Sequence, residues 1–157
     1  MNVPALVVLD MAGTTVEDRG QVPAAFESAL RAAGVPVTSE QISGVRGASK
    51  RQAIRQLLPP GQKSLADAIY LDFRDRLAHS YRGHVNEITG ATRVMQSLTA
   101  RGIRVTLNTG FDRDITSLLL SQLGWSYPVV CGDDVTNGRP APDLIQQAMA
   151  IHGIQDP

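Results

Sequence analysis

The sequence predicts an α/β fold in which a parallel sheet carries a helical insertion after its first strand. The first observation behind this prediction is a continuous apolar run at residues 5–9, ending at Asp10, which is typical of a buried parallel strand. The second is the helical pattern of residues 16–87, after which strand and helix alternate again. We therefore expect a sheet core built from residues 1–15 and 88–157, with residues 16–87 forming a helical cap.

Helices with ordinary start and stop signals fill the insertion. Pro23 lies near the first turn of one helix and Gly34 ends it, while Ser49 is expected to cap another. The expected helices cover residues 23–33, a short segment from Thr38, residues 50–58 and residues 64–82. The last is amphipathic, with apolar residues at every fourth position: Leu65, Ile69, Phe73 and Leu77. A helical lid can exclude water from a site and bring a catalytic group to it.

Strand and helix alternate over the rest of the chain. The expected elements are a helix over residues 90–101, a strand over 103–108, a helix from its cap at Asp112 to Gly124, a strand over 129–131 and a helix over 141–151. Open α/β sheets place their chemistry at the carboxyl ends of the strands. The residues that directly follow each strand are therefore the first candidates for a functional site.

A polar group suited to phosphoryl chemistry follows each of the three strands. Asp10 ends the first strand, where a carboxylate can act as a nucleophile, and Gly13 lets the backbone approach a ligand closely. Thr109 follows the second strand, where its hydroxyl and the next backbone N–H groups form an anion site. Arg139 follows the third and can neutralise both a carboxylate and a phosphoryl group. Each of these residues is also common in ordinary turns, so it is their order along the chain that favours a catalytic site.

Composition excludes several classes of function. The chain has 157 residues, of which 43% are hydrophobic, and a formal net charge of zero, so bulk charge implies neither a nucleic-acid partner nor an acidic membrane surface. Its single cysteine, Cys131, excludes an internal disulfide framework. No leader-like segment opens the chain and no apolar run approaches the ~20 residues that span a bilayer. We therefore predict a cytoplasmic protein without a membrane or nucleic-acid partner.

These motifs resemble those of the haloacid dehalogenase-like hydrolase superfamily, within it the phosphonatase branch, over essentially the whole chain. Asp10 matches the nucleophile, Thr109 the hydroxyl of the second motif and Arg139 the cation of the third. Most members carry a second aspartate, a general acid/base, where this chain has Ala12, but the run Asp-Met-Ala-Gly-Thr-Thr resembles the phosphonatase motif, which also has alanine there. The resemblance implies a Rossmann-like parallel core, a Mg²⁺ cofactor and a small phosphorylated or phosphonate metabolite as substrate.

Lys50 occupies the place at which phosphonatases carry a lysine that forms a Schiff base with the substrate aldehyde. An imine provides the electron sink that cleavage of a C–P bond needs, whereas a phosphatase needs a general acid for its leaving oxygen. Three interpretations of Lys50 stay open: an imine former, a phosphate clamp, and a solvated surface lysine. Arg46 and Ala53 depart from the phosphonatase pattern, which has methionine and histidine there, so a related substrate stays open beside phosphonoacetaldehyde.

The metal site is expected to be incomplete in this sequence. Asp10 and the carbonyl of Ala12 are the expected Mg²⁺ ligands, but the acidic fourth motif of the superfamily does not occur before Pro157. Asp133 and Asp134 match family residues outside that motif and are not assigned as ligands. We therefore expect a core that is incomplete at its C-terminus, an exposed edge at the first strand, weak Mg²⁺ binding and little hydrolysis.

The leading hypothesis is a hydrolase that cleaves the C–P bond of phosphonoacetaldehyde or a similar substrate through an aspartyl-phosphate and a lysine imine. The alternatives are a phosphatase or phosphoryl-transfer enzyme that acts on a small phosphate ester, and an inactive fragment with a binding or structural role. The sequence does not determine the oligomeric state, and a homodimer is left open. Besides the catalytic residues, substrate contacts are expected from Ala12, Gly13, Thr14, Arg46, Gly47 and Gly110.

Overall fold

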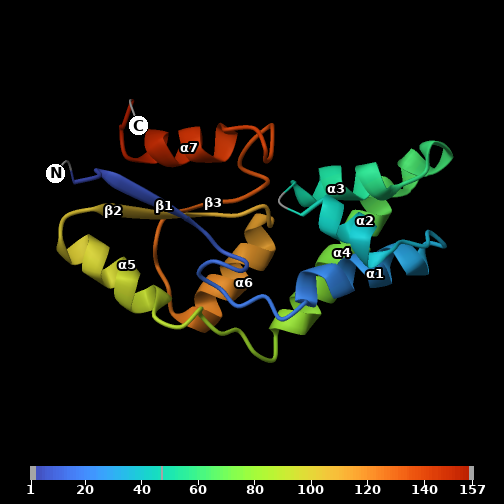
Figure 1. Cartoon of the computed structure of the whole chain (residues 1–157), viewed down its shortest axis with the longest axis horizontal. Helices are drawn as coiled ribbons and strands as arrows, with labels where there is room; N and C mark the ends of the chain where they lie inside the picture. Colours follow the sequence, from blue (N-terminus) through green and yellow to red (C-terminus); the bar gives the residue numbers. More distant parts are fainter. Residues whose placement is uncertain (1–2, 47, 156–157) are drawn as a thin grey trace.

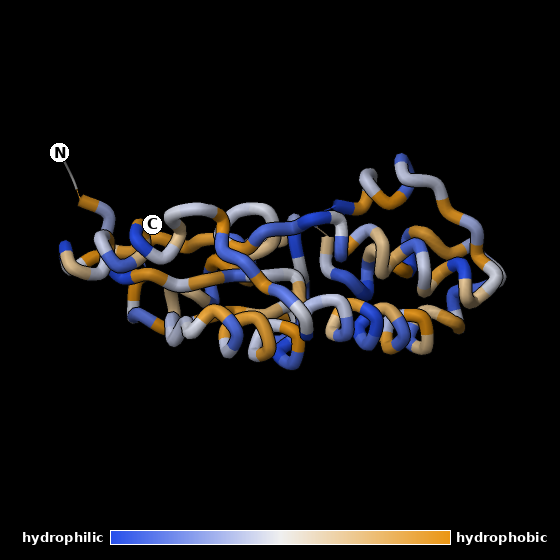
Figure 2. The backbone as a smooth tube through the Cα atoms, turned by 90° about the horizontal axis from the view of Figure 1, so that it is seen from below, coloured by the Kyte–Doolittle hydropathy of each residue, from blue (hydrophilic) through white to orange (hydrophobic). Residues whose placement is uncertain are grey.

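The computed structural model describes residues 3–46 and 48–155, which form two lobes (Figure 1). The sheet lobe contains the three strands and the helices α5, α6 and α7, and the helical lobe contains α1 to α4. In the view of Figure 2 the segments that join the lobes are coloured mostly as hydrophilic, in agreement with their polar sequence. Among the described residues, no helix is both long and apolar enough to span a membrane.

The sheet has three parallel strands in the order β1 (Leu6–Asp10), β2 (Arg104–Asn108) and β3 (Val129–Val130). Asp10 pairs in register with Asn108, which in turn pairs with Val130, so the carboxyl ends of the strands lie side by side. This confirms the predicted α/β class. β1 is an edge strand of the described sheet and its five residues are only half-buried. The expectation of full burial there was therefore wrong, and the expected exposed edge is observed.

Helices cover both faces of this sheet. Helix α7 (Asp143–Ile151) covers one face, while α5 (Ala91–Ala100) and α6 (Arg113–Leu123) lie on the other (Figure 1). The predicted N-cap of α6 is confirmed, because Asp112 accepts a hydrogen bond from the backbone N–H of Ile115 at 3.0 Å. The side chains that fill the two interfaces are fully buried: Met95, Leu107, Leu119 and Ala148. The carboxyl ends of the strands are left facing the helical lobe.

The helical lobe is built around α4 (Ala66–Tyr81), against which α1 (Gln21–Ala32) and α3 (Lys50–Leu57) pack. Phe26 of α1 and Phe73 of α4 stack with their ring centres 4.3 Å apart. The short α2 (Ser39–Gly44) begins at its capping residue Thr38 as predicted.

The predicted start of the long helix at Ser64 was wrong. A 3₁₀-helix (Pro60–Leu65) precedes α4, because the chain enters this turn through two consecutive prolines, and the tighter geometry continues to Leu65. Leu65 was predicted to lie on the buried stripe of the helix, but it is 39% exposed, whereas Ile69, Phe73 and Leu77 are buried.

Two neighbouring backbone segments connect the lobes. The N–H of Glu17 donates to the carbonyl of Asn86 at 2.9 Å, and the N–H of Ile88 donates to the carbonyl of Thr15 at 2.8 Å. Both bonds lie at the boundaries expected between the core and the cap, and they support that division, which stays a prediction.

Candidate active site

Asp10 is held at the carboxyl end of β1 by a tight turn. The backbone N–H groups of Thr14, Thr15 and Val16 all donate to the carbonyl of Met11, at 2.9 to 3.0 Å. Gly13 has a φ of +84°, a conformation that strongly favours glycine. The turn fixes the end of the strand, and Asp10 lines a pocket of about 720 Å³ between the lobes.

Thr109 follows β2 directly and lines the same pocket. It is 2% exposed, and its backbone N–H donates to the carbonyl of Val130 at 3.0 Å. Its hydroxyl oxygen accepts the N–H of Phe111 at 3.1 Å. This bond uses the hydroxyl only as an acceptor, so its proton can be donated to an anion in the pocket.

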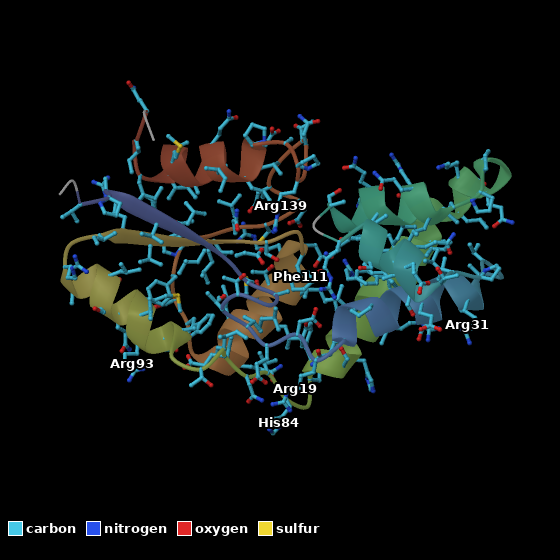
Figure 3. All side chains as sticks on the ribbon, in the orientation of Figure 1. Arg19, Arg31, His84, Arg93, Phe111 and Arg139 are labelled. Carbon is cyan, nitrogen blue, oxygen red and sulfur yellow. The ribbon has the colours of Figure 1, made fainter. Side chains whose placement is uncertain are left out.

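Arg139, on the segment between β3 and α7, reaches back to the first strand. One terminal nitrogen of its guanidinium donates to Oδ1 of Asp10 at 2.8 Å, across 129 positions of sequence. Its Nε is buried and has no hydrogen-bond partner among the described residues. Figure 3 places Arg139 and Phe111 in the region between the sheet and the helical lobe. The guanidinium therefore keeps donor capacity for an anion beside the carboxylate.

Lys50 enters this pocket from the helical lobe, at the first position of α3. Its Nζ lies 5.6 Å from the ring centre of Phe111 and 6.0 Å from that of Phe26. It also approaches the sheet lobe, since a Cβ added at Gly110 would lie 3.9 Å from it. Burial, and after it the positive charge of Arg139, lower the pKa of Lys50 to about 8, against the opposing effect of the negative charge of Asp10. A substantial fraction of this amine is therefore neutral near pH 8.

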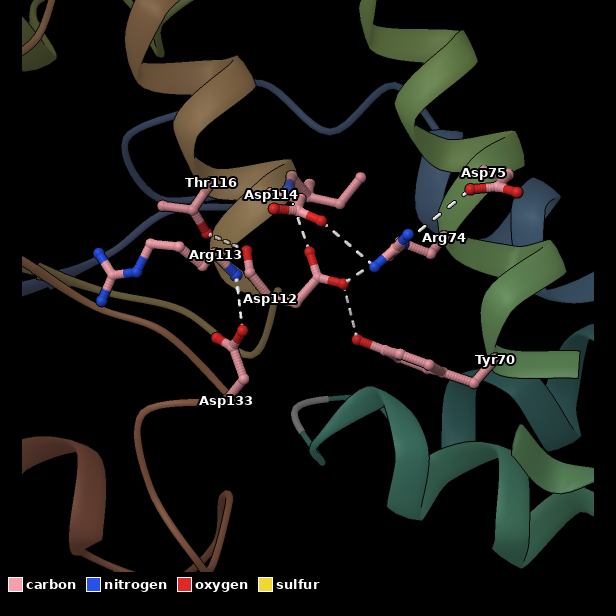
Figure 4. A network of polar contacts seen from close by, with 9 residues as sticks. Tyr70, Arg74, Asp75, Asp112, Arg113, Asp114, Thr116 and Asp133 are labelled. Carbon is pink, nitrogen blue, oxygen red and sulfur yellow. Dashed lines mark hydrogen bonds and ion pairs between the residues drawn. The ribbon is translucent and has the colours of Figure 1, made fainter. Parts of the chain in front are cut away.

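Two contacts join the lobes in the neighbourhood of Lys50. Its neighbour Ser49 packs against Gly138 so closely that a Cβ at Gly138 would overlap the Cβ of Ser49. At the N-terminus of α6, the buried carboxylate of Asp112 accepts the hydroxyl of Tyr70 at 2.9 Å and lies 3.8 Å from Nε of Arg74 (Figure 4). Tyr70 and Arg74 both belong to α4, so Asp112 links the sheet lobe to the central helix of the helical lobe.

Replacement of Gly138 by alanine is expected to destabilise the protein by about 1–3 kcal/mol, the usual cost of overpacking. This corresponds to a loss of several degrees in Tm, measured by circular dichroism. Adding Ser49→Gly should recover most of the loss, because it removes the opposing Cβ, and glycine costs only a few tenths of a kcal/mol at an N-cap. A double variant no more stable than Gly138→Ala alone would contradict this account of the contact.

The structure brings most of the predicted site residues into one pocket. Besides the four catalytic candidates, the lining includes Ala12, Gly13, Arg46 and Gly110. Thr14 was predicted as a substrate contact, but it does not line the pocket, because the turn uses its N–H internally and leaves it exposed. Gly47, also predicted as a contact, lies outside the described residues.

Other residues of the pocket were not predicted from the sequence. They include Asp18 in the segment between the turn after β1 and α1, Ser39 and Ser43 on α2, and the two phenylalanines beside Lys50, Phe26 and Phe111. Ser39 and Ser43 had one available signal: their spacing from Arg46 places all three on one side of a helix. Asp18 had none, since a single acidic residue in a polar linker is usually solvated.

The described residues do not complete a Mg²⁺ site. Within them, no group of three or more histidine, cysteine, aspartate or glutamate side chains could hold a metal ion. Asp133 and Asp134 are both occupied with Arg113, since Asp133 accepts its backbone N–H at 3.1 Å and Asp134 its guanidinium. Asp10 and the carbonyl of Ala12 remain as the two oxygens that this part of the chain would contribute.

A family model described as haloacid dehalogenase-like hydrolase matches residues 7–156. The chain belongs to this family. Like the site, the match extends over both lobes, and it confirms the resemblance inferred from the motifs. It also places the chain in a family of enzymes, as expected.

Among curated proteins, the relatives in this hydrolase family include several named phosphonoacetaldehyde hydrolase. The one from Latilactobacillus sakei is 28% identical over 96% of this chain, and one from Syntrophobacter fumaroxidans is 30% identical over 87%. The chain spans 64% of the length of the first of these relatives and 56% of the second.

Several solved structures share the fold of this chain. A phosphonoacetaldehyde hydrolase-like protein from Oleispira antarctica aligns with a TM-score of 0.83 over 99% of this chain and 65% of its own, at 23% identity. A variant of CbbY from Rhodobacter sphaeroides in complex with xylulose-1,5-bisphosphate aligns with a TM-score of 0.80 over 97% of this chain and 74% of its own, at 18% identity.

Proposed function

We propose that this chain carries the nucleophile and the imine-forming lysine of a phosphonatase-type hydrolase, which cleaves the C–P bond of phosphonoacetaldehyde or a similar β-carbonyl phosphonate. One observation carries the proposal: the partly buried amine of Lys50, with its pKa lowered to about 8, lines the same pocket as the carboxylate of Asp10. A neutral amine is the form that adds to a carbonyl, and a carboxylate at the end of a strand is a suitable nucleophile for phosphorus.

The reaction that these two residues support proceeds in balanced steps. The neutral amine of Lys50 adds to the substrate carbonyl, one proton is taken up from solvent, water leaves, and a protonated imine forms. An oxygen of Asp10 then attacks phosphorus, the C–P bond breaks, and its electron pair moves into the imine to give an enamine. The enamine carbon takes up a proton, and water releases the aldehyde from Lys50 and phosphate from Asp10.

Thr109 and Arg139 would hold the phosphoryl group while it is transferred. The hydroxyl of Thr109 has a free proton to donate, and Arg139 has a buried Nε without a partner among the described residues. Both groups are fixed before substrate arrives, which is the arrangement that stabilises developing charge most effectively. The contact of Arg139 with Asp10 at 2.8 Å would also orient that carboxylate.

The phosphatase alternative uses Lys50 as a clamp for a phosphate group. Arg46 favours it, because a third cation in the pocket, besides Lys50 and Arg139, suits a substrate rich in phosphate. Ala12 argues against it, because no carboxyl group occupies the position from which the superfamily protonates a leaving oxygen. We therefore place C–P cleavage first.

Further features of the proposal have separate grounds. A Mg²⁺ cofactor, which when bound would neutralise charge on the phosphoryl oxygens, is proposed from the family, and a cytoplasmic location is proposed from the composition, while the oligomeric state is left open. Asp10 and Ala12 are the metal ligands that this chain would supply, and the reaction steps above use only its own side chains.

The proposal is tested by comparing substrates. Whatever phosphate is released from phosphonoacetaldehyde is expected to be accompanied by an equal amount of acetaldehyde, the phosphate measured by colorimetry and the aldehyde by coupled reduction. The control substrate 2-aminoethylphosphonate has the same carbon–phosphorus skeleton without a carbonyl, and it should release no phosphate. Faster release of phosphate from glucose 1-phosphate or phosphoglycolate than from phosphonoacetaldehyde would transfer the assignment to the phosphatase alternative.

A further inference from the structure

One face of α2 lines the pocket with polar side chains that the reaction above does not use. Ser39 and Ser43 lie four positions apart, and Arg46 follows three positions later, just beyond the end of the helix. All three line the pocket, whereas Glu40 and Gln41, on the other side of the helix, do not. The surface that α2 and its C-terminal turn present to the pocket therefore combines two hydroxyls and a guanidinium with the apolar side chains of Ile42 and Val45, while Glu40 is directed elsewhere.

Arg46 differs from Arg139, the other arginine of the pocket, in its ion pairing. Arg139 is paired with Asp10, and the nearby carboxylate of Glu27 is paired with Arg31 at 2.5 Å. No carboxylate among the described residues lies within 4.0 Å of the guanidinium of Arg46. Its charge is near enough to Lys50 to contribute to the lowering of the pKa of that amine. The pocket thus contains a cation without an ion-pair partner near the proposed site of imine formation.

We propose that Arg46, with Ser39 and Ser43, binds a carboxylate on the substrate, so that the substrate class is a phosphonate with both a β-carbonyl and a carboxylate, that is, a phosphono-oxo acid. A guanidinium donates two parallel hydrogen bonds to a carboxylate, and each hydroxyl can donate one more. One unpaired guanidinium matches the single charge of a carboxylate better than the double charge of a phosphate. This inference rests on the proposed function, because the imine at Lys50 places the carbonyl between the two anionic groups.

The experiment measures covalent trapping at Lys50. Borohydride reduces the imine to a stable secondary amine by hydride addition, and the mass of the modified protein reports the adduct. Four probes are compared: phosphonoacetaldehyde, the methyl ketone 2-oxopropylphosphonate, 3-phosphonopyruvate and 5-phosphono-4-oxopentanoate. The methyl ketone is the control for ketone reactivity, because it has the β-carbonyl phosphonate group of the oxo acids without their carboxylate. The two oxo acids, 3-phosphonopyruvate and 5-phosphono-4-oxopentanoate, carry the carboxylate at different distances from the carbonyl.

At least one of the two oxo acids is expected to be trapped at a concentration about tenfold or more below that needed for the methyl ketone. Arg46→Gln should remove most of this advantage, while Arg46→Lys should keep part of it because the charge remains. The readout is the ratio of the concentrations at which the methyl ketone and the oxo acids are trapped. Any effect of Arg46 on the pKa of Lys50 alters the trapping of all probes alike and therefore leaves this ratio unchanged. Arg76→Gln is the matched control, since it removes the same charge from α4 in the helical lobe, at a residue that does not line the pocket.

The outcomes separate this inference from the proposed function. If phosphonoacetaldehyde and the methyl ketone are trapped as readily as both oxo acids, or if Arg46→Gln leaves the ratio unchanged, the carboxylate site is wrong and the imine stands. If no probe is trapped at Lys50, the proposed function fails and this inference fails with it.

Discussion

Asp10→Asn is expected to reduce the release of phosphate from phosphonoacetaldehyde by more than about a hundredfold. The amide cannot attack phosphorus, and loss of a covalent nucleophile normally removes almost all catalysis. Phosphate release is followed at substrate concentrations below saturation, so that the ratio of kcat/KM values reports the loss of transition-state stabilisation.

The fold should survive this substitution. Asparagine is nearly isosteric with aspartate, and the ion pair that is lost to Arg139 is about one-third exposed on both sides. Asp72→Asn provides the control, because it also breaks an aspartate–arginine pair, with Arg76 at 2.9 Å, but at a residue that does not line the pocket. A phosphate-release rate for Asp10→Asn above about one-hundredth of the parent rate would exclude Asp10 as the nucleophile.

Lys50→Arg is expected to be as inactive as Lys50→Ala. A guanidinium remains charged and does not form an imine, so keeping the positive charge should not help if the amine acts covalently. A clamp for phosphate needs only the charge, and it would leave Lys50→Arg with much of the parent activity. The kcat values of the two variants on phosphonoacetaldehyde therefore distinguish the two roles, and an active arginine variant would support the phosphatase alternative.

The lowered pKa of Lys50 adds a pH dependence to this result. Only the neutral amine adds to a carbonyl, and a pKa of about 8 leaves about one-tenth of it neutral at pH 7, far more than for an ordinary lysine. Imine formation should accelerate about tenfold per pH unit below pH 8 and level off above it.

The sequence predicted best those features that depend on neighbouring residues. The caps at Ser49 and Asp112 are both observed, because a hydroxyl or carboxylate before a helix bonds to the next turn of the same chain. The parallel alignment of β1 and β2 followed from apolar runs of the right length. Thr14 was predicted as a substrate contact but does not line the pocket, because a sequence motif does not show which of its side chains the turn directs into the pocket.

Features that depend on distant segments could not be derived from local patterns. The approach of Ser49 to Gly138 and the bond from Tyr70 to Asp112 join residues that are far apart in the sequence. Asp18 likewise becomes part of the pocket only because the segment between the turn after β1 and α1 passes between the lobes. Neither composition nor periodicity carries information on such contacts, which arise when the helical lobe packs on the sheet lobe.

Borohydride trapping with phosphonoacetaldehyde tests the central claim most directly, because it detects the covalent bond itself and does not require turnover. The reduced adduct should map to the peptide that contains Lys50, and it should be absent from Lys50→Arg and Lys50→Ala. Lys63→Arg, a lysine of the same lobe outside the pocket, should be trapped like the parent chain. An adduct on another lysine, or none under conditions that reduce imines, would contradict the assignment of Lys50.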